Sequence, residues 1–155
     1  YSERDAPKVN THTVKLETGR GRELEKGFCP GGHGSLWNLA EDEPSIAVIK
    51  DFNKQRKPMA LVCHAPAALK KVKNEDGEPL VKGKTVTGFT NSEEAAVQLT
   101  DIVPFLVEDM LKENGGKFSK ADDWGVNVVE DGNLITGQNP ASSEKAAEHL
   151  YEMLK

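Results

Sequence analysis

The chain has 155 residues, a net charge of −5 and a pI near 5.4, and 37% of its residues are hydrophobic. This length argues for one domain over residues 1–155. No basic stripe is present, which argues against nucleic acid or an anionic membrane as partner. No apolar run approaches the roughly 20 residues that cross a bilayer. Two cysteines are too few for a secreted disulfide framework, so a cytoplasmic location is expected, although a Cys29–Cys63 bridge stays open.

The first half of the chain predicts strands that alternate with helices. A weak strand signal at Val14 and Leu16 precedes a loop at 19–22, and a short strand is expected at 28–29. Helices are expected at 36–39 and 43–52, and Pro58 ends the second of them. The apolar run at 59–63 is typical of a strand that is covered on both faces. It leads directly into a helix at 64–69, with Pro66 in its first turn.

The second half continues this alternation. A strand is expected at 84–89, a helix at 92–99 capped by Asn91 or Ser92, and a helix at 104–114. Strands at 126–129 and 134–136 flank an Asp131-Gly132 turn, and a helix over 142–154 closes the chain. Such alternation predicts an α/β fold with a parallel sheet and helices on both faces. Ligands of such sheets bind beyond the carboxyl ends of the strands, where Cys63 and the glycine cluster at 31–34 should face one crevice.

Cys63 is the strongest candidate for chemistry. It ends an apolar strand and is followed at once by a predicted helix, whose N-terminal partial charge would favour a thiolate. A sharp turn at this junction would project the thiol into solvent, as in the nucleophile elbow of hydrolases. A buried core cysteine is the alternative, and spacing alone leaves it open.

His64 and two glutamates are the candidate partners of this thiol. Adjacency in sequence does not establish a Cys63–His64 pair, and a surface histidine remains the alternative. If His64 does reach the sulfur, a carboxylate should orient its other ring nitrogen, and Glu93 and Glu94 are candidates. Both glutamates would also suit the first turn of a helix for dipole reasons alone.

The glycine cluster offers backbone donors. Gly31, Gly32 and His33 could place N–H groups where an oxyanion develops, while a plain tight turn is the competing account. Cys29 is interpreted as structural.

Several ordered blocks resemble the ThiJ/PfpI superfamily, whose members are class I glutamine amidotransferase-like. PGGHG at 30–34 with LWNL at 36–39 is similar to its glycine-rich block. ALVCHAPAAL at 60–69 is similar to its elbow, where Gly is more usual than Ala65. The segments TGFTNSEE, VPFLVE and LITGQNPASS, at 87–94, 103–108 and 134–143, resemble the branch that contains glyoxalase III and related heat-shock chaperones. The likeness covers roughly residues 13–155.

This resemblance implies a flavodoxin-like three-layer sandwich with a mainly parallel sheet. It implies a lyase that needs no cofactor or metal and converts methylglyoxal, a small aldehyde, and water to lactate. Cys63 would be the nucleophile that forms a hemithioacetal, His64 the general acid/base, and Glu94 the residue that orients it. Gly31, Gly32 and His33 would form the oxyanion and substrate-binding region, together with the His64 N–H.

The chain departs from the family at its N-terminus. The family's first strand and helix, which carry a glutamate that hydrogen-bonds the thiol, have no counterpart before Thr13, and residues 1–27 match poorly. We therefore expect an N-terminally truncated fold, with an open sheet edge that invites pairing with a second copy in a homodimer. The alternative function is a stress-response chaperone, holdase or deglycase with a vestigial site. A peptidase or amidotransferase is less favoured, since amidotransferases of this superfamily place their histidine far from the cysteine in sequence.

Overall fold

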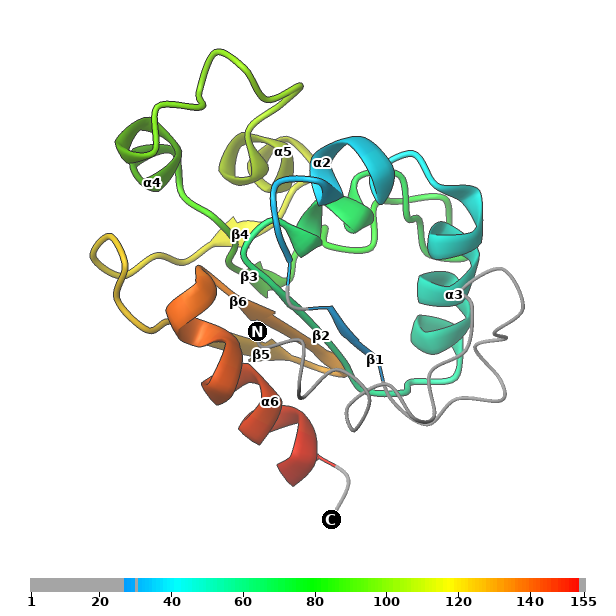
Figure 1. Ribbon diagram of the computed structural model, residues 1–155. Helices are drawn as coiled ribbons and strands as arrows, with labels where there is room; N and C mark the ends of the chain where they lie inside the picture. The colour runs from blue at the N-terminus through cyan, green and yellow to red at the C-terminus, as the bar shows by residue number, and fades with distance from the viewer. Residues whose placement is uncertain (1–26, 30, 154–155) are drawn as a thin grey trace, which may run out of the picture.

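Four strands form the main sheet of the computed structural model, which describes residues 27–29 and 31–153 (Figure 1). Their order is β1 (Gly27–Cys29), β2 (Met59–Val62), β6 (Leu134–Gly137) and β5 (Val128–Asp131). The first three are parallel, and β5 pairs antiparallel with β6. The prediction of a mainly parallel sheet in an α/β fold is confirmed.

Alternate side chains of β2 enter two different cores. Met59 and Leu61 pack in the core formed with α2 (Ser35–Asn38), α3 (Glu43–Lys54) and α5 (Val107–Glu113). Ala60 and Val62 pack in a second core with Ala146 and Leu150 of α6 (Ser143–Glu152), which lies on the opposite face of the sheet (Figure 1). Because strand side chains alternate between faces, one fully apolar strand supplies both cores. The helices and sheet therefore form three layers.

Two of the helices begin at clear capping residues. Asp42 caps α3 by accepting from the Ser45 N–H at 3.0 Å. Thr90 caps α4 (Asn91–Ala96) in a capping box with Glu93. The predicted cap at Asn91 or Ser92 was therefore wrong by one or two residues.

The predicted strand at 84–89 contributes only β3 (Thr85–Val86), which pairs with β4 (Lys117–Phe118) in a separate two-stranded sheet. The rest of this segment bonds other partners. The Thr87 N–H donates to Thr136 Oγ1 at 2.9 Å, and the Phe89 N–H donates to the Cys63 carbonyl at 2.9 Å. The segment thus bonds to β6 and to the residue after β2 instead of extending a ladder.

Three other elements differ from expectation. The residues after Cys63 form a short 3₁₀ helix, η2 (Ala65–Leu69), and a second one, η3 (Pro140–Ser142), precedes α6. Strand β5 starts two residues later than predicted and ends at the turn that contains Gly132, whose φ is 62°. The expected strand near Val14 and the loop at 19–22 lie outside the described residues. No helix in the described ranges has the length and apolar character needed to cross a membrane.

Candidate active site at the cysteine elbow

Cys63 occupies a backbone conformation that non-glycine residues seldom adopt. It follows β2 directly, and its φ is 64°. Its N–H donates to the Gly137 carbonyl, and its carbonyl accepts from the Phe89 N–H, each at 2.9 Å. Two hydrogen bonds from neighbouring segments therefore hold the residue in its strained conformation, as expected where strain accompanies function.

Gly31 brings the glycine cluster against this elbow. Its φ is 98°, and a Cβ there would lie 2.3 Å from the Val62 carbonyl oxygen and 3.0 Å from Cys63 Cβ. Any side chain would separate the two segments. The close approach lets the Gly32 backbone N–H reach the sulfur as a hydrogen-bond donor, and the His64 N–H is a second donor.

The sulfur is buried rather than projected into solvent. Cys63 is only 5% exposed, and burial raises the pKa of its thiol to about 12, although the His64 and Gly32 backbone N–H groups act in the opposite direction. The expectations of a solvent-facing and readily ionised thiol were therefore wrong. The segment that follows is a five-residue 3₁₀ helix and not the predicted α-helix.

The His64 ring lies between the thiol and a carboxylate. Its Nδ1 is 3.1 Å from Cys63 Sγ, and its Nε2 is 2.7 Å from Glu94 Oε2. Because a carboxylate accepts, the ring hydrogen is assigned to Nε2, which leaves Nδ1 free to take the thiol proton. Burial lowers the pKa of His64, while the bond to Glu94 opposes that shift. Among the described residues, no side chain other than His64 hydrogen-bonds the sulfur.

Glu93, the neighbouring candidate, faces away from this histidine. Its Oε1 accepts from the Thr90 N–H at 3.1 Å and the Gln138 amide at 3.2 Å. Its Oε2 accepts from the Trp124 N–H and the Asn139 amide, both at 2.8 Å. Glu93 therefore connects the start of α4 to two loops, as expected for a glutamate that stabilises the first turn of a helix. Glu94 is the glutamate that hydrogen-bonds His64.

His33 contacts the second oxygen of Glu94. Its Nε2 is 2.7 Å from Glu94 Oε1, and its ring centroid is 3.9 Å from that of His64. His33, which was predicted to belong to the oxyanion and substrate-binding region, thus bonds the Glu94 carboxylate. The two histidines and Glu94 are residue types that divalent metals bind, and their ligand atoms lie within 4.8 Å of one another.

One aromatic residue that sequence analysis left out of the site, Phe89, packs against the histidine pair, and a second, Trp124, packs against Phe89. The Phe89 ring centroid lies 4.3 Å from that of His64, and the Trp124 ring lies 5.7 Å beyond Phe89. Phe89 is buried and Trp124 is 45% exposed. The sequence signal for Phe89 was its place at the end of a predicted strand, where side chains face the crevice.

Cys29 lies outside this arrangement. Both cysteines are free thiols, so the disulfide left open above does not form in this structure. Burial raises the pKa of the Cys29 thiol as well.

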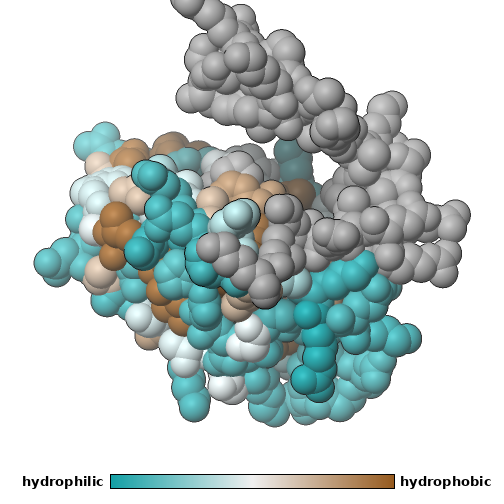
Figure 2. Space-filling view, turned by 90° about the horizontal axis from the view of Figure 1, so that it is seen from below, coloured by the Kyte–Doolittle hydropathy of each residue, from teal (hydrophilic) through white to brown (hydrophobic). Residues whose placement is uncertain are grey.

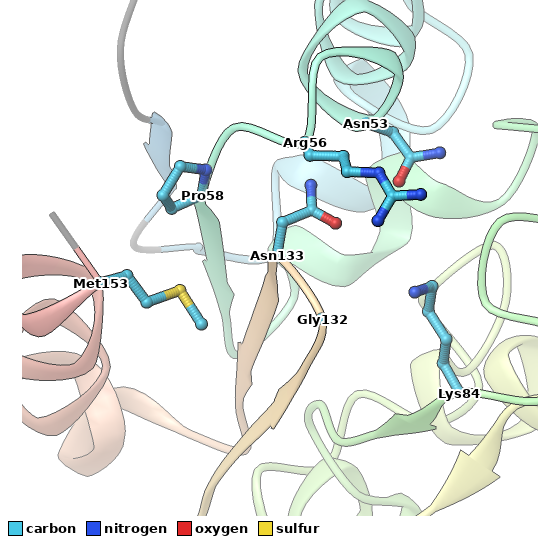
Figure 3. Close-up of a pocket in the computed structure, with 7 residues that line it drawn as sticks. All are labelled: Asn53, Arg56, Pro58, Lys84, Gly132, Asn133 and Met153. Atoms are coloured by element: carbon cyan, nitrogen blue, oxygen red, sulfur yellow. The ribbon is translucent and has the colours of Figure 1, made fainter.

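A pocket of about 560 Å³ lies at the other end of the sheet (Figure 3). Pro58 and Asn133, which immediately precede β2 and β6, line it, and the Arg56 and Lys84 side chains extend toward it. Figure 2 shows the molecule from below, where hydrophilic side chains cover much of the described surface. Cys63 follows the last residue of β2, so this pocket and the thiol lie at opposite ends of that strand.

Known proteins resemble this chain in sequence. The DJ-1/PfpI family model matches residues 27–153. The "Glutathione-independent glyoxalase HSP31" of Saccharomyces cerevisiae is 31% identical over 134 residues, which cover 83% of this chain and 56% of that protein. The chain thus spans little more than half of that relative.

Two solved structures extend the comparison. The Rapid Encystment Protein 24 kDa of Francisella tularensis has a TM-score of 0.88 and 35% identity, covering 92% of this chain and 63% of that one. Glyoxalase III of Candida albicans has a TM-score of 0.84 and 27% identity, covering 89% and 60%. Both neighbours contain the three-layer fold that the glycine-rich block and the elbow predicted. The chain belongs to the DJ-1/PfpI family.

Proposed function

We propose that the protein is a glyoxalase III-like lyase that converts methylglyoxal and water to lactate without a cofactor. The observation that carries the proposal is the Cys63–His64–Glu94 alignment, with 3.1 Å from sulfur to Nδ1 and 2.7 Å from Nε2 to the carboxylate. A nucleophile, a base and a group that orients the base are the parts that such chemistry needs. Relatives named as glyoxalases support the choice of substrate.

The first step couples proton transfer to attack. Because burial raises the pKa of the Cys63 thiol to about 12, little free thiolate is present near neutral pH. The thiol proton moves to His64 Nδ1 as the sulfur forms a bond to the aldehyde carbon. The carbonyl electron pair becomes an alkoxide, which the N–H groups of Gly32 and His64 would stabilise, with Gly31 beside the substrate. The alkoxide then takes the proton from Nδ1 to give a hemithioacetal.

The second step is an internal redox rearrangement. His64 Nδ1 removes the hydrogen of the former aldehyde carbon as a proton, and the electron pair forms the double bond of an enediolate whose charge lies on the former ketone oxygen. The hydroxyl proton of the former aldehyde carbon passes to that oxygen, and Nδ1 returns its proton to the neighbouring carbon, which gives a lactoyl thioester on Cys63. One carbon is oxidised as its neighbour is reduced, so no external oxidant or reductant takes part. Water then attacks the thioester, the carbon–sulfur bond breaks, the sulfur regains its proton, and lactate leaves.

The test compares the two cysteines of the chain. We expect purified protein to form lactate from methylglyoxal without glutathione. Cys63→Ser should lower the rate by at least about 100-fold, because an alcohol is far less nucleophilic than a thiol paired with a base. Cys29→Ser is the matched control and should keep the rate within about twofold. Turnover that survives Cys63→Ser would contradict the proposal.

A holdase is the second candidate, and the surface supports it. The described chain exposes several large hydrophobic side chains, among them Ile102 at 64%, Val126 at 57% and Trp37 at 50%. Exposed apolar surface binds unfolded clients without a reactive sulfur. A Cys63→Ala variant that still suppresses aggregation of a heated client protein would support this function, provided that lactate formation is absent from the wild type.

A further inference from the structure

Glu94 is shared between two histidines that are distant in sequence. Its Oε1 lies 2.7 Å from His33 Nε2, and its Oε2 lies 2.7 Å from His64 Nε2. The Glu94 side chain is only 2% exposed. His64 is fully buried, while His33 is 34% exposed at the rim. The centroids of the two rings lie 3.9 Å apart. His33 thus approaches the catalytic arrangement from the solvent side.

These two contacts give each carboxylate oxygen of Glu94 one histidine partner. Among the described residues, His33 is the one side chain that hydrogen-bonds Glu94 Oε1. Without it, a nearly fully buried carboxylate oxygen would lose its hydrogen-bond partner, which is unfavourable for a charged group. Rotation of the carboxylate would then relieve that cost by moving Oε2 away from His64. His64 could equally place its hydrogen on Nδ1, where it would block acceptance of the thiol proton.

We propose that His33 is a positioning residue that holds Glu94 in place, so that His64 keeps its hydrogen on Nε2 and presents an unprotonated Nδ1 to Cys63. This inference rests on the proposed function for its kinetic consequence. Its structural consequence, the tautomer of His64, is independent of any substrate. The role differs from the substrate-binding position that the resemblance gave to His33, because His33 Nε2 bonds the carboxylate.

The experiment compares three substitutions in the full chain. His33→Gln places an amide N–H near the position of Nε2, His33→Asn carries the same amide one methylene short of it, and His33→Leu removes the donor. All three fit a position that is one-third exposed. The tautomer of His64 is read by NMR of ¹⁵N-labelled imidazole at a pH where the ring is neutral, with the His64 signals identified by their loss in His64→Gln. Lactate formation from methylglyoxal gives kcat and KM.

The proposal expects the Nε2–H tautomer of His64 in the wild type and in His33→Gln, and a growing Nδ1–H population in His33→Asn and His33→Leu. It expects kcat to fall by about 10- to 100-fold in the last two, as for other residues that orient a functional ligand, and to recover within about threefold in His33→Gln. KM should change little. If His33→Asn and His33→Leu keep the wild-type tautomer, the proposal is overturned.

The design separates the two hypotheses. A wild type that forms no lactate but shows the tautomer change in His33→Asn refutes the glyoxalase and leaves the positioning role standing. A wild type that forms lactate, with equal kcat and an unchanged tautomer in His33→Asn, refutes the positioning role alone. If His33→Leu does not fold, the comparison between His33→Gln and His33→Asn still decides, since both are small polar changes at the same rim position.

Discussion

At the Cys63 sulfur, burial opposes two backbone donors, and burial has the larger effect. The thiol pKa is raised to about 12, compared with about 8.5 for an exposed cysteine. In the proposed reaction, the paired imidazole would therefore accept the proton during attack, because burial keeps the resting sulfur protonated near neutral pH. Catalysis would depend on alignment and not on a stored thiolate.

This pKa predicts an unusual pH dependence of alkylation. An acid with a raised pKa has a thiolate fraction that rises about tenfold per pH unit until that pKa is reached. In a Cys29→Ser background, the iodoacetamide rate at Cys63 should rise steadily between pH 7 and pH 10.5, measured by intact-protein mass spectrometry. Cys63 in the unfolded Cys29→Ser chain is the reference, and its alkylation rate should level off above about pH 9. A plateau in the alkylation rate of folded Cys63 near pH 9 would show that burial does not raise the pKa of this thiol.

At the scale of elements, the contact between the glycine cluster and the elbow sets the position of the site. Gly31→Ala should lower the free energy of unfolding by about 2–4 kcal/mol, since it adds a Cβ 2.3 Å from the Val62 carbonyl oxygen to a residue with positive φ. Gly77→Ala is the matched control, because its φ is 84° and no atom lies within 4 Å of the added Cβ. Gly77→Ala should lower the free energy of unfolding by only about 1–2 kcal/mol, which is the cost of a side chain at positive φ. Urea unfolding measures both, and equal losses would rule out the close approach as the cause.

Helix α4 carries two adjacent glutamates with different tasks. Glu93→Gln should lower the free energy of unfolding by about 2–3 kcal/mol, because donors from Thr90, Trp124 and Asn139 converge on its two oxygens. Glu113→Gln, at the exposed end of α5, should change stability by less than about 0.5 kcal/mol. Thermal or urea unfolding gives these values. A Glu93→Gln variant as stable as wild type would mean that this network does not hold the loops.

The parts of this arrangement that sequence could predict are those that depend on local pattern. The apolar run before Cys63 and the glycines at 31–34 define the strand and the elbow, because strand burial and tight turns have strong local signals. The burial of the sulfur could not be predicted, since it depends on Phe89 and other residues that pack from separate segments. Likewise, the His33–Glu94 bond joins residues 61 positions apart, and no periodicity connects them.

At the scale of the whole molecule, β1 is the edge strand of the main sheet within the described residues. Within the part of the chain that the structure describes, β1 pairs with β2 alone, and Figure 1 shows it at the end of the strand order. Phe28, at its centre, is 40% exposed. An edge strand with one open side and an exposed aromatic residue is a template for pairing with another chain. We therefore expect a homodimer or larger association through this edge.

Sedimentation velocity over a range of protein concentrations measures this association. Phe28→Lys should shift the distribution toward the monomer, because a charge on an edge strand opposes pairing with a second copy. Ile102→Lys is the matched control: Ile102 is 64% exposed but lies outside every strand of the described chain, so its replacement should leave the distribution unchanged. If Ile102→Lys dissociates the protein and Phe28→Lys does not, association depends on general hydrophobic surface, which would also favour the holdase. A monomeric wild type at all concentrations would show that the β1 edge is not used by a second copy.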